Sequence, residues 1–156
     1  WVFSPVGHCF PKTILRLAMG RQNLAINNDQ IGAPTSAYFL ASVTALAARD
    51  YLSGLGHEYG LYNLASSGET SWLGYAECLL GMARDMGFGS LPKALSLTPS
   101  FGQDPLRPAK RPLNSRLETF SVEKELGIKC PPWQSEVAKF LYHLSKVDPS
   151  LKNFSP

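Results

Sequence analysis

The chain has 156 residues, of which 44% are hydrophobic and 17% are charged. This size and composition are typical of one globular domain and exclude a disordered or collagen-like chain. The most apolar stretch, residues 37–48, is interrupted by Ser42 and Thr44 and is shorter than the roughly 18 residues that indicate a membrane span. We therefore expect a folded domain with no membrane partner.

The net charge of +3 comes from 15 Lys and Arg against 12 Asp and Glu, and the excess is local. Arg107, Lys110, Arg111 and Arg116 place four cations and no anion in ten residues, whereas eleven cations face twelve anions elsewhere. A nucleic-acid footprint is normally wider than one such cluster. The pattern favours a small, multiply charged anion such as a diphosphate and argues against a nucleic-acid partner.

The start of the chain and its cysteines bear on its origin. The sequence opens at Trp1 inside an apolar Trp-Val-Phe run, without Met and without a signal-peptide pattern, which predicts a fragment of a longer protein. Cys9, Cys78 and Cys130 are odd in number and unevenly spaced. This usage is typical of a reducing compartment, so we expect a cytoplasmic location.

Helical and extended segments alternate in the first half of the chain. The expected elements are, in order, a strand end at 1–3, a helix over 13–19 that Gly20 ends, a strand at 24–26, a loop over 27–34, and a helix that Thr35 or Ser36 caps and that runs to about Leu52. The apolar face of that second helix is predicted from four residues at core spacing, which are Leu40, Val43, Leu46 and Ala47.

The alternation continues in the second half. The expected elements are a strand at 61–65, a turn at 66–68, a helix from Thr70 or Ser71 to Met86, a strand at 94–97, an irregular proline-rich stretch at 99–112, a short helix at 121–126 and a last helix from Trp133 to about Lys146. The pattern predicts an α/β architecture. We assign residues 1–146 to one domain and 147–156 to a flexible tail.

Local enzyme signatures are absent or misplaced. The sequence has no Gly-x-x-x-x-Gly-Lys loop, no His-Glu-x-x-His and no Cys-x-x-Cys. The glycines of residues 54–60 follow a predicted helix rather than a strand, so they are interpreted as a plain loop. Tyr142 and Lys146 are spaced as in short-chain dehydrogenases but lie too near the C-terminus. We predict no catalytic, cofactor-binding or metal-binding residue in this chain.

A series of short motifs gives the strongest signal. They are, in order, Trp1-Val2-Phe3, residues 10–18, Asp29-Gln30-Ile31-Gly32-Ala33-Pro34-Thr35-Ser36, residues 60–72, Arg111-Pro112-Leu113-Asn114-Ser115 and Trp133. In order and spacing these motifs resemble the C-terminal half of dTDP-4-dehydrorhamnose reductases, which are extended short-chain dehydrogenases. The resemblance covers about residues 1 to 144, with mild departures such as Leu113 where Ala is usual.

The resemblance implies a fold and an activity. The fold would be α/β, the C-terminal half of an extended short-chain dehydrogenase, with the remaining strands of a Rossmann-type sheet and a small α/β substrate-binding lobe. The activity would be reduction of the C4 keto group of dTDP-4-dehydro-L-rhamnose by NADPH, giving dTDP-L-rhamnose. In the family, the cofactor turn and the catalytic tyrosine and lysine lie upstream of the residue that matches Trp1, so the chain alone is expected to be inactive.

The resemblance also implies a substrate site for the dTDP-sugar. Trp1 would lie at the sugar, and the loop over 30–35 would line the pocket; the alternatives are a buried strand-end aromatic and a simple turn with a helix cap. A guanidinium can grip phosphate through paired donors, so Arg111 is assigned to the diphosphate, with Arg107 and Lys110 as screening charges, against the alternative of a solvated loop. The predicted substrate-binding residues are Trp1, Gln30, Gly32, Pro34, Thr35, Arg111 and Asn114.

A second functional class stays open at this stage. Relatives of this fold serve as regulatory subunits, so the chain could be a non-catalytic nucleotide-sugar-binding or regulatory protein. In either case the isolated chain lacks the first strand-to-helix turn of such folds and is expected not to bind NADPH. Uncovered strand edges predict marginal stability or self-association, for instance as a homodimer.

Overall fold

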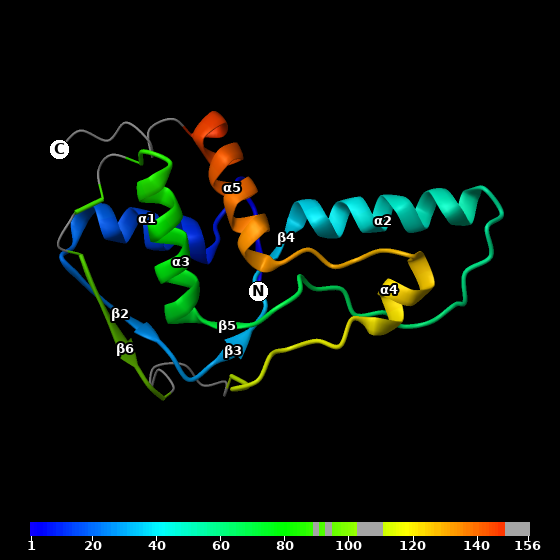
Figure 1. The fold of residues 1–156 in the computed structure, drawn as a ribbon, viewed down its shortest axis with the longest axis horizontal. Coiled ribbons are helices and arrows are strands. Elements are labelled where there is room, and N and C mark those ends of the chain that lie inside the picture. Colours follow the sequence, from blue (N-terminus) through cyan, green and yellow to red (C-terminus); the bar gives the residue numbers. More distant parts are fainter. Residues whose placement is uncertain (89–90, 93–94, 103–110, 149–156) are drawn as a thin grey trace.

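The computed structural model describes residues 1–88, 91–92, 95–102 and 111–148. Helices and strands alternate in it (Figure 1). The elements are β1 (Val2–Phe3), α1 (Phe10–Gly20), β2 (Asn23–Asn27), β3 (Ile31–Gly32), β4 (Thr35–Ser36), α2 (Ala37–Leu52), β5 (Thr70–Ser71), α3 (Trp72–Asp85), β6 (Ser96–Ser100), α4 (Phe120–Leu126) and α5 (Trp133–Val147). Arg107, Lys110 and the segment 149–156 of the predicted tail lie outside the described residues.

The described strands form three two-stranded sheets. β1 pairs with β4 in parallel, with Val2 beside Thr35, and β2 pairs with β6 in parallel, with Leu24 beside Leu97. β3 and β5 form a short antiparallel pair. The expected α/β class is therefore confirmed, and the short β1–β4 and β3–β5 pairs lie next to each other where the chain leaves the helical body (Figure 1).

The core lies among α1, α3 and α5. On α3 the apolar residues recur at helical spacing, and Ala76, Leu79, Leu80 and Ala83 are at most 1% exposed. The facing residues of α5 include Val137, Leu141 and Leu144, all fully buried. An aromatic cluster continues the core toward β1, with Phe3, Phe10, Trp72, Tyr75 and Trp133 in mutual ring contact.

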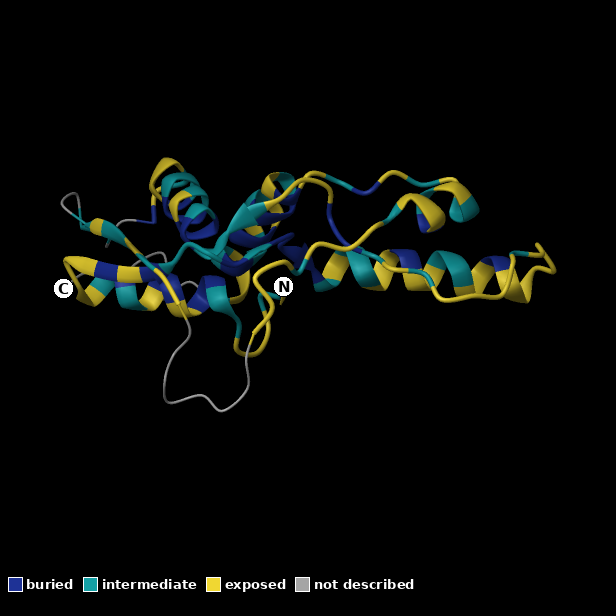
Figure 2. Cartoon of the chain, turned by 90° about the horizontal axis from the view of Figure 1, so that it is seen from below, coloured by how far each residue is buried: buried dark blue, intermediate teal, exposed yellow. Residues whose placement is uncertain are grey.

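Helix α2 is less buried than its predicted apolar face suggested. Of the four residues at core spacing only Val43 is buried, while Leu40, Leu46 and Ala47 are half-buried. The helix extends away from the α1–α3–α5 body, alongside α4 and the segment that links α2 to β5 (Figure 1). Figure 2 shows exposed and half-buried residues over most of its length. None of the described helices is long and apolar enough to cross a membrane.

Three predicted boundaries need correction. Residues 61–65 form no strand and run as irregular chain between α2 and β5. Helix α1 begins at Phe10 rather than Thr13, because Pro11 occupies its first turn, where a fixed φ and a missing N–H are tolerated. Strand β6 extends to Ser100 and includes Pro99, so the irregular stretch begins later than predicted, and its residues 103–110 lie outside the described part.

Candidate functional site

Trp1 lies at the start of β1 and packs on the first residue of α3. Its indole stacks on that of Trp72, with ring centroids 3.8 Å apart and planes 15° from parallel. Phe10 contacts the same Trp72 ring at 4.5 Å between centroids. The Thr35 N–H donates to the Trp1 carbonyl oxygen at 3.0 Å, so the backbone of Trp1 is fixed by β4. Trp1 is therefore held both by its ring and by its main chain.

Gly32 lies directly against this stack. A Cβ at position 32 would lie 2.6 Å from Cε2 and 2.9 Å from Cζ2 of Trp1. Real Cβ atoms do not approach aromatic carbons so closely, and the indole cannot retreat because Trp72 lies on it. Glycine is required here for close approach of the backbone.

Gln30 connects the same loop to α3. It is 9% exposed, and its side-chain Oε1 accepts a hydrogen bond from Trp72 Nε1 at 3.2 Å. Its own N–H donates to Asn27 Oδ1 at 3.1 Å. A buried indole N–H needs an acceptor, and the Gln30 amide supplies it. Gln30 thus fixes the Trp72 ring on which Trp1 stacks.

Pro34 and Thr35 are buried and shape the loop from inside. The Thr35 hydroxyl donates to the Ala33 carbonyl at 3.1 Å and accepts from the Ser66 N–H at 3.2 Å. Of the two predicted caps for α2, Ser36 is the one observed, with its Oγ accepting from the Phe39 N–H at 3.0 Å. The turn-and-cap alternative for residues 32–35 is therefore only partly right, because the cap is Ser36 rather than Thr35 and residues 33–34 link β3 to β4 without a turn.

The Ser36 hydroxyl also donates a hydrogen bond to the Glu136 carboxylate of α5. The Glu136 side chain is 3% exposed, and Lys139 Nζ lies 2.8 Å from its other oxygen. A carboxylate in such a place must have partners to offset its desolvation. This contact links the candidate loop to α5, and no local pattern in the sequence indicated it.

The segment around Asn114 lies beside β3. The Ile31 N–H donates to the Leu113 carbonyl at 2.7 Å, and the Ser115 N–H donates to the Ile31 carbonyl at 2.8 Å. Asn114 Oδ1 accepts from the N–H and the Nε of Arg116, at 3.1 and 3.0 Å. Asn114 thus orients its own loop through Arg116, while its predicted contact with the substrate stays a prediction.

The predicted basic cluster is partly neutralised. Arg116 Nη1 forms an ion pair with Glu69 Oε2 at 2.7 Å, and both side chains are about half exposed. Arg111 is exposed and lies three residues before Asn114. Arg107 and Lys110 lie outside the described residues, so Arg111 and Arg116 are the members of the cluster that the structure places on the surface.

Asp29 holds the start of the loop to the end of β6. Its carboxylate accepts from the Gly102 N–H at 2.6 Å and from the Asn27 amide at 2.7 Å. These donors, the Gly102 N–H first, hold the pKa of Asp29 below its ordinary value. Asp29 therefore remains charged and acts as a structural acceptor rather than as an acid or base.

The structure thus brings Trp1, Gly32 and Gln30 together through Trp72 and places Asn114 on the neighbouring strand edge. The sequence analysis did not predict the contact between Trp72 and Gln30. The available signal was the indole N–H of Trp72, a hydrogen-bond donor that needs an acceptor, next to the helix cap Ser71. The described residues contain no group of three or more His, Cys, Asp or Glu that could hold a metal ion.

These features define an α/β substrate-binding module of the dehydrogenase type, in which a glycine-containing loop and two stacked indoles meet at the ends of short strands. Residues 1–146 match the family model described as the RmlD substrate binding domain, and the chain belongs to this family. The resemblance found in its motifs is therefore confirmed.

Individual relatives agree with this assignment. The chain is 40% identical over 144 residues to dTDP-4-dehydrorhamnose reductase of Escherichia coli K12, covering 92% of this chain and 47% of the relative. It resembles the crystal structure of a dTDP-4-dehydrorhamnose reductase from Clostridium acetobutylicum with TM-score 0.77 and 26% identity, over 93% of this chain and 46% of that one.

The reductase of Bacillus anthracis, solved in complex with NADP, has the same TM-score of 0.77 at 23% identity, over 92% of this chain and 46% of that one, and shows the fold alone. The chain therefore spans about half the length of the relatives it matches.

Proposed function

We propose that this chain forms the sugar-nucleotide side of the cleft in an NADPH-dependent reductase that converts dTDP-4-dehydro-L-rhamnose to dTDP-L-rhamnose. The observation that carries the proposal is the close packing of Gly32 against the Trp1 and Trp72 stack, in a chain whose relatives are named dTDP-4-dehydrorhamnose reductases. Rigid aromatic surfaces next to a few fixed polar groups are typical of small-molecule sites.

Each candidate residue has a role in this proposal. Trp1 presents an indole of fixed orientation to the sugar, and Gln30 with Gly32 fixes that orientation through Trp72 and through close contact. Pro34 and Thr35 shape the loop from the buried side. Arg111 binds the diphosphate as a paired donor, and Asn114 orients the segment that carries it. The chemical step itself belongs to residues outside this chain.

NADPH would supply the hydride. One described strand leads through a bend with a positive-φ glycine into a helix, from β1 through Gly7 to α1, but that bend holds a single glycine; the glycines of segment 54–60 follow α2 and precede irregular chain. A dinucleotide pyrophosphate normally binds at a glycine-rich turn between a strand and a helix. The chain therefore does not fit the cofactor, and we assign the NADPH site to the rest of the full-length protein.

We further propose a homodimer in the cytoplasm. Two-stranded β2–β6 has one unpaired edge on each strand among the described residues, and such edges favour association. Cys9, Cys78 and Cys130 are free thiols, which fits a reducing compartment. Light scattering of this chain at two concentrations tests the dimer, and a constant monomer mass contradicts it.

The function is tested with the full-length protein. We expect its sequence to carry Gly-x-x-Gly-x-x-Gly and Tyr-x-x-x-Lys, and the purified protein to consume NADPH when dTDP-4-dehydro-L-rhamnose is added. Binding of dTDP-sugar without turnover, in an intact gene lacking both motifs, would instead identify a non-catalytic binding subunit. Absence of both binding and turnover overturns the proposal.

A further inference from the structure

A cavity of about 550 Å³ is lined by the second half of α2, the segment from Gly54 to Leu64 and α4. This end of α2 lies away from the N-terminus (Figure 1). Cavities of this size accommodate small organic molecules. None of the residues assigned to the nucleotide-sugar site lines it.

The lining combines apolar and aromatic side chains. Its apolar members include Val43, Ala47, Leu64, Val122 and Leu126, and its aromatic members are Tyr51, Tyr59 and Tyr62. The Tyr51 and Tyr59 rings approach edge to face at 6.5 Å and are 65% and 90% exposed. Aromatic rings beside a cavity attract organic cations.

The charge of the lining is negative. Glu58 and Glu125 belong to it, and none of the sixteen residues around the cavity is Lys or Arg. Burial first, and then the negative charges of Glu125 and Glu58, raise the pKa of the Tyr62 phenol. The two carboxylates, unlike the burial, favour a cation in the cavity.

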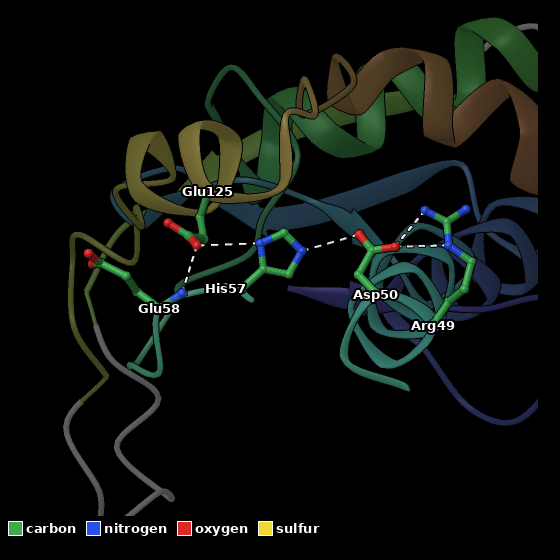
Figure 3. A network of polar contacts seen from close by, with 5 residues as sticks. All are labelled: Arg49, Asp50, His57, Glu58 and Glu125. Carbon is green, nitrogen blue, oxygen red and sulfur yellow. Dashed lines mark hydrogen bonds and ion pairs between the residues drawn. The ribbon is translucent and has the colours of Figure 1, made fainter. Parts of the chain in front are cut away.

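His57 lies between carboxylates from two helices (Figure 3). Its Nε2 is 3.2 Å from Asp50 Oδ2, and its Nδ1 is 3.4 Å from Glu125 Oε1, which also accepts from the Glu58 N–H at 2.8 Å. Arg49 pairs with the other oxygen of Asp50 at 2.6 Å. A neutral imidazole has one N–H and serves one of these acceptors, whereas an imidazolium serves both.

We propose that this cavity binds a small organic cation, an ammonium group on an apolar body, with Glu125 and Glu58 as counter-charges and the tyrosine rings in the lining. The cation shares the Glu125 carboxylate with His57, whose Nδ1 lies 3.4 Å from Glu125 Oε1.

Calorimetric titration of the full-length protein with choline tests this inference. The matched neutral probe is 3,3-dimethylbutan-1-ol, in which carbon replaces the cationic nitrogen. We expect choline to bind with an affinity at least about tenfold above that of the alcohol. Equal affinity for the two probes, or no choline binding, overturns the proposal.

Two variants locate the site. Glu125→Gln removes the counter-charge but keeps an oxygen acceptor for the Glu58 N–H, and we expect at least about a tenfold loss of choline affinity. Glu77→Gln, an exposed carboxylate on α3 outside the cavity, should leave choline affinity unchanged. Equal effects of the two variants contradict a site at this cavity. Circular dichroism of Glu125→Gln checks that the fold is retained, and Tyr62→Leu gives a second, charge-neutral variant with the same expected loss.

Discussion

The indoles of Trp1 and Trp72 lie face to face, with ring centroids 3.8 Å apart, and Gly32 lies against the Trp1 indole. Three segments that are distant in sequence, β1, β3 and the start of α3, meet at this point. The orientation of Trp1 is therefore determined by packing from both sides rather than by its own strand. Any change that separates these three segments should alter the candidate sugar site before it alters the core.

Gly32→Ala tests that packing. The added methyl would lie 2.6 Å from Trp1 Cε2, and the ring behind cannot move away. We expect a loss of about 1–3 kcal/mol in the free energy of unfolding, the usual range for overpacking, together with a loss of near-ultraviolet circular dichroism from the stacked indoles. Urea denaturation and near-ultraviolet spectra measure the two effects.

Gly81→Ala is the matched control. Gly81 lies inside α3, and a Cβ there meets nothing within 4 Å. Alanine in a helix interior is more favourable than glycine by about 0.5–1 kcal/mol, so this variant should be as stable as the parent or slightly more so. If Gly32→Ala behaves in the same way as Gly81→Ala, Trp1 is not held as described.

Most helices were predictable from sequence because their signals are local. The caps Ser36 and Ser71 and the apolar spacing of α3 and α5 act within a few residues, and the structure confirms them within a few positions. Segment 61–65 was predicted as a strand. It remains irregular since Leu61 is 96% exposed and no described strand pairs with this segment.

The candidate site was predictable only in part. Its loop was found through motifs, but its geometry depends on contacts between distant residues. Gln30 with Trp72, Ser36 with Glu136 and Arg116 with Glu69 are each a pairing across many residues. A single sequence carries no periodic signal for such pairs. The partial neutralisation of the basic cluster by Glu69 was missed for this reason.

Ser36→Ala should destabilise the protein more than an ordinary cap substitution. The variant loses the cap of α2, about 1 kcal/mol, and also a hydrogen bond to the buried Glu136 carboxylate, about 1.5–3 kcal/mol for a charged partner. We expect a total loss of about 2–4 kcal/mol in the free energy of unfolding, measured by urea denaturation.

Ser71→Ala provides the comparison. Ser71 caps α3 through the Gly74 N–H at 3.0 Å but donates to the neutral amide oxygen of Asn28. Ser71→Ala should lose about 1–2 kcal/mol in the free energy of unfolding. Equal losses for the two serines would show that the charge of Glu136 contributes nothing to the position of Ser36.

Asp50 should make stability depend on acid pH. Hydrogen bonds from Arg49 and then from His57 hold the pKa of Asp50 below its ordinary value. A carboxylate with a lowered folded-state pKa stabilises the fold above its unfolded pKa, and this contribution is lost as pH falls through the folded value. Between about pH 4 and pH 2, the free energy of unfolding should therefore decrease more steeply in the parent than in Asp50→Asn. Parallel urea series across this range measure it, and identical slopes would contradict the assignment.

Tyr75→Phe should leave the protein equally stable or more stable by about 1 kcal/mol, because a buried hydroxyl without a partner gains nothing from folding. The Tyr75 hydroxyl is buried and has no hydrogen-bond partner among the described residues, and burial raises its pKa. Thermal and urea unfolding measure the change. Tyr62→Phe, which removes the donor to the Glu58 carbonyl at 2.8 Å, should instead lose about 0.5–1.5 kcal/mol. A clear loss in Tyr75→Phe would reveal a partner for that hydroxyl.

The assignment of Arg111 to the substrate diphosphate concerns the full-length protein, in which the cleft is whole. Arg111→Ala should weaken substrate binding by about 1.5–3 kcal/mol, the range for a hydrogen bond between charged groups. Arg111→Lys should recover part of this, because a point charge cannot reproduce the planar guanidinium fork. Since the diphosphate is remote from the reacting carbon, the effect should fall mainly on KM.

Steady-state kinetics of Arg111→Ala, with NADPH and the dTDP-sugar varied independently, tests most directly whether this chain forms the sugar-nucleotide side of the cleft. The account predicts a KM for the sugar nucleotide that rises by about tenfold to a hundredfold, with the KM for NADPH nearly unchanged. An unchanged KM for the sugar nucleotide would contradict it and return Arg111 to a solvated surface loop.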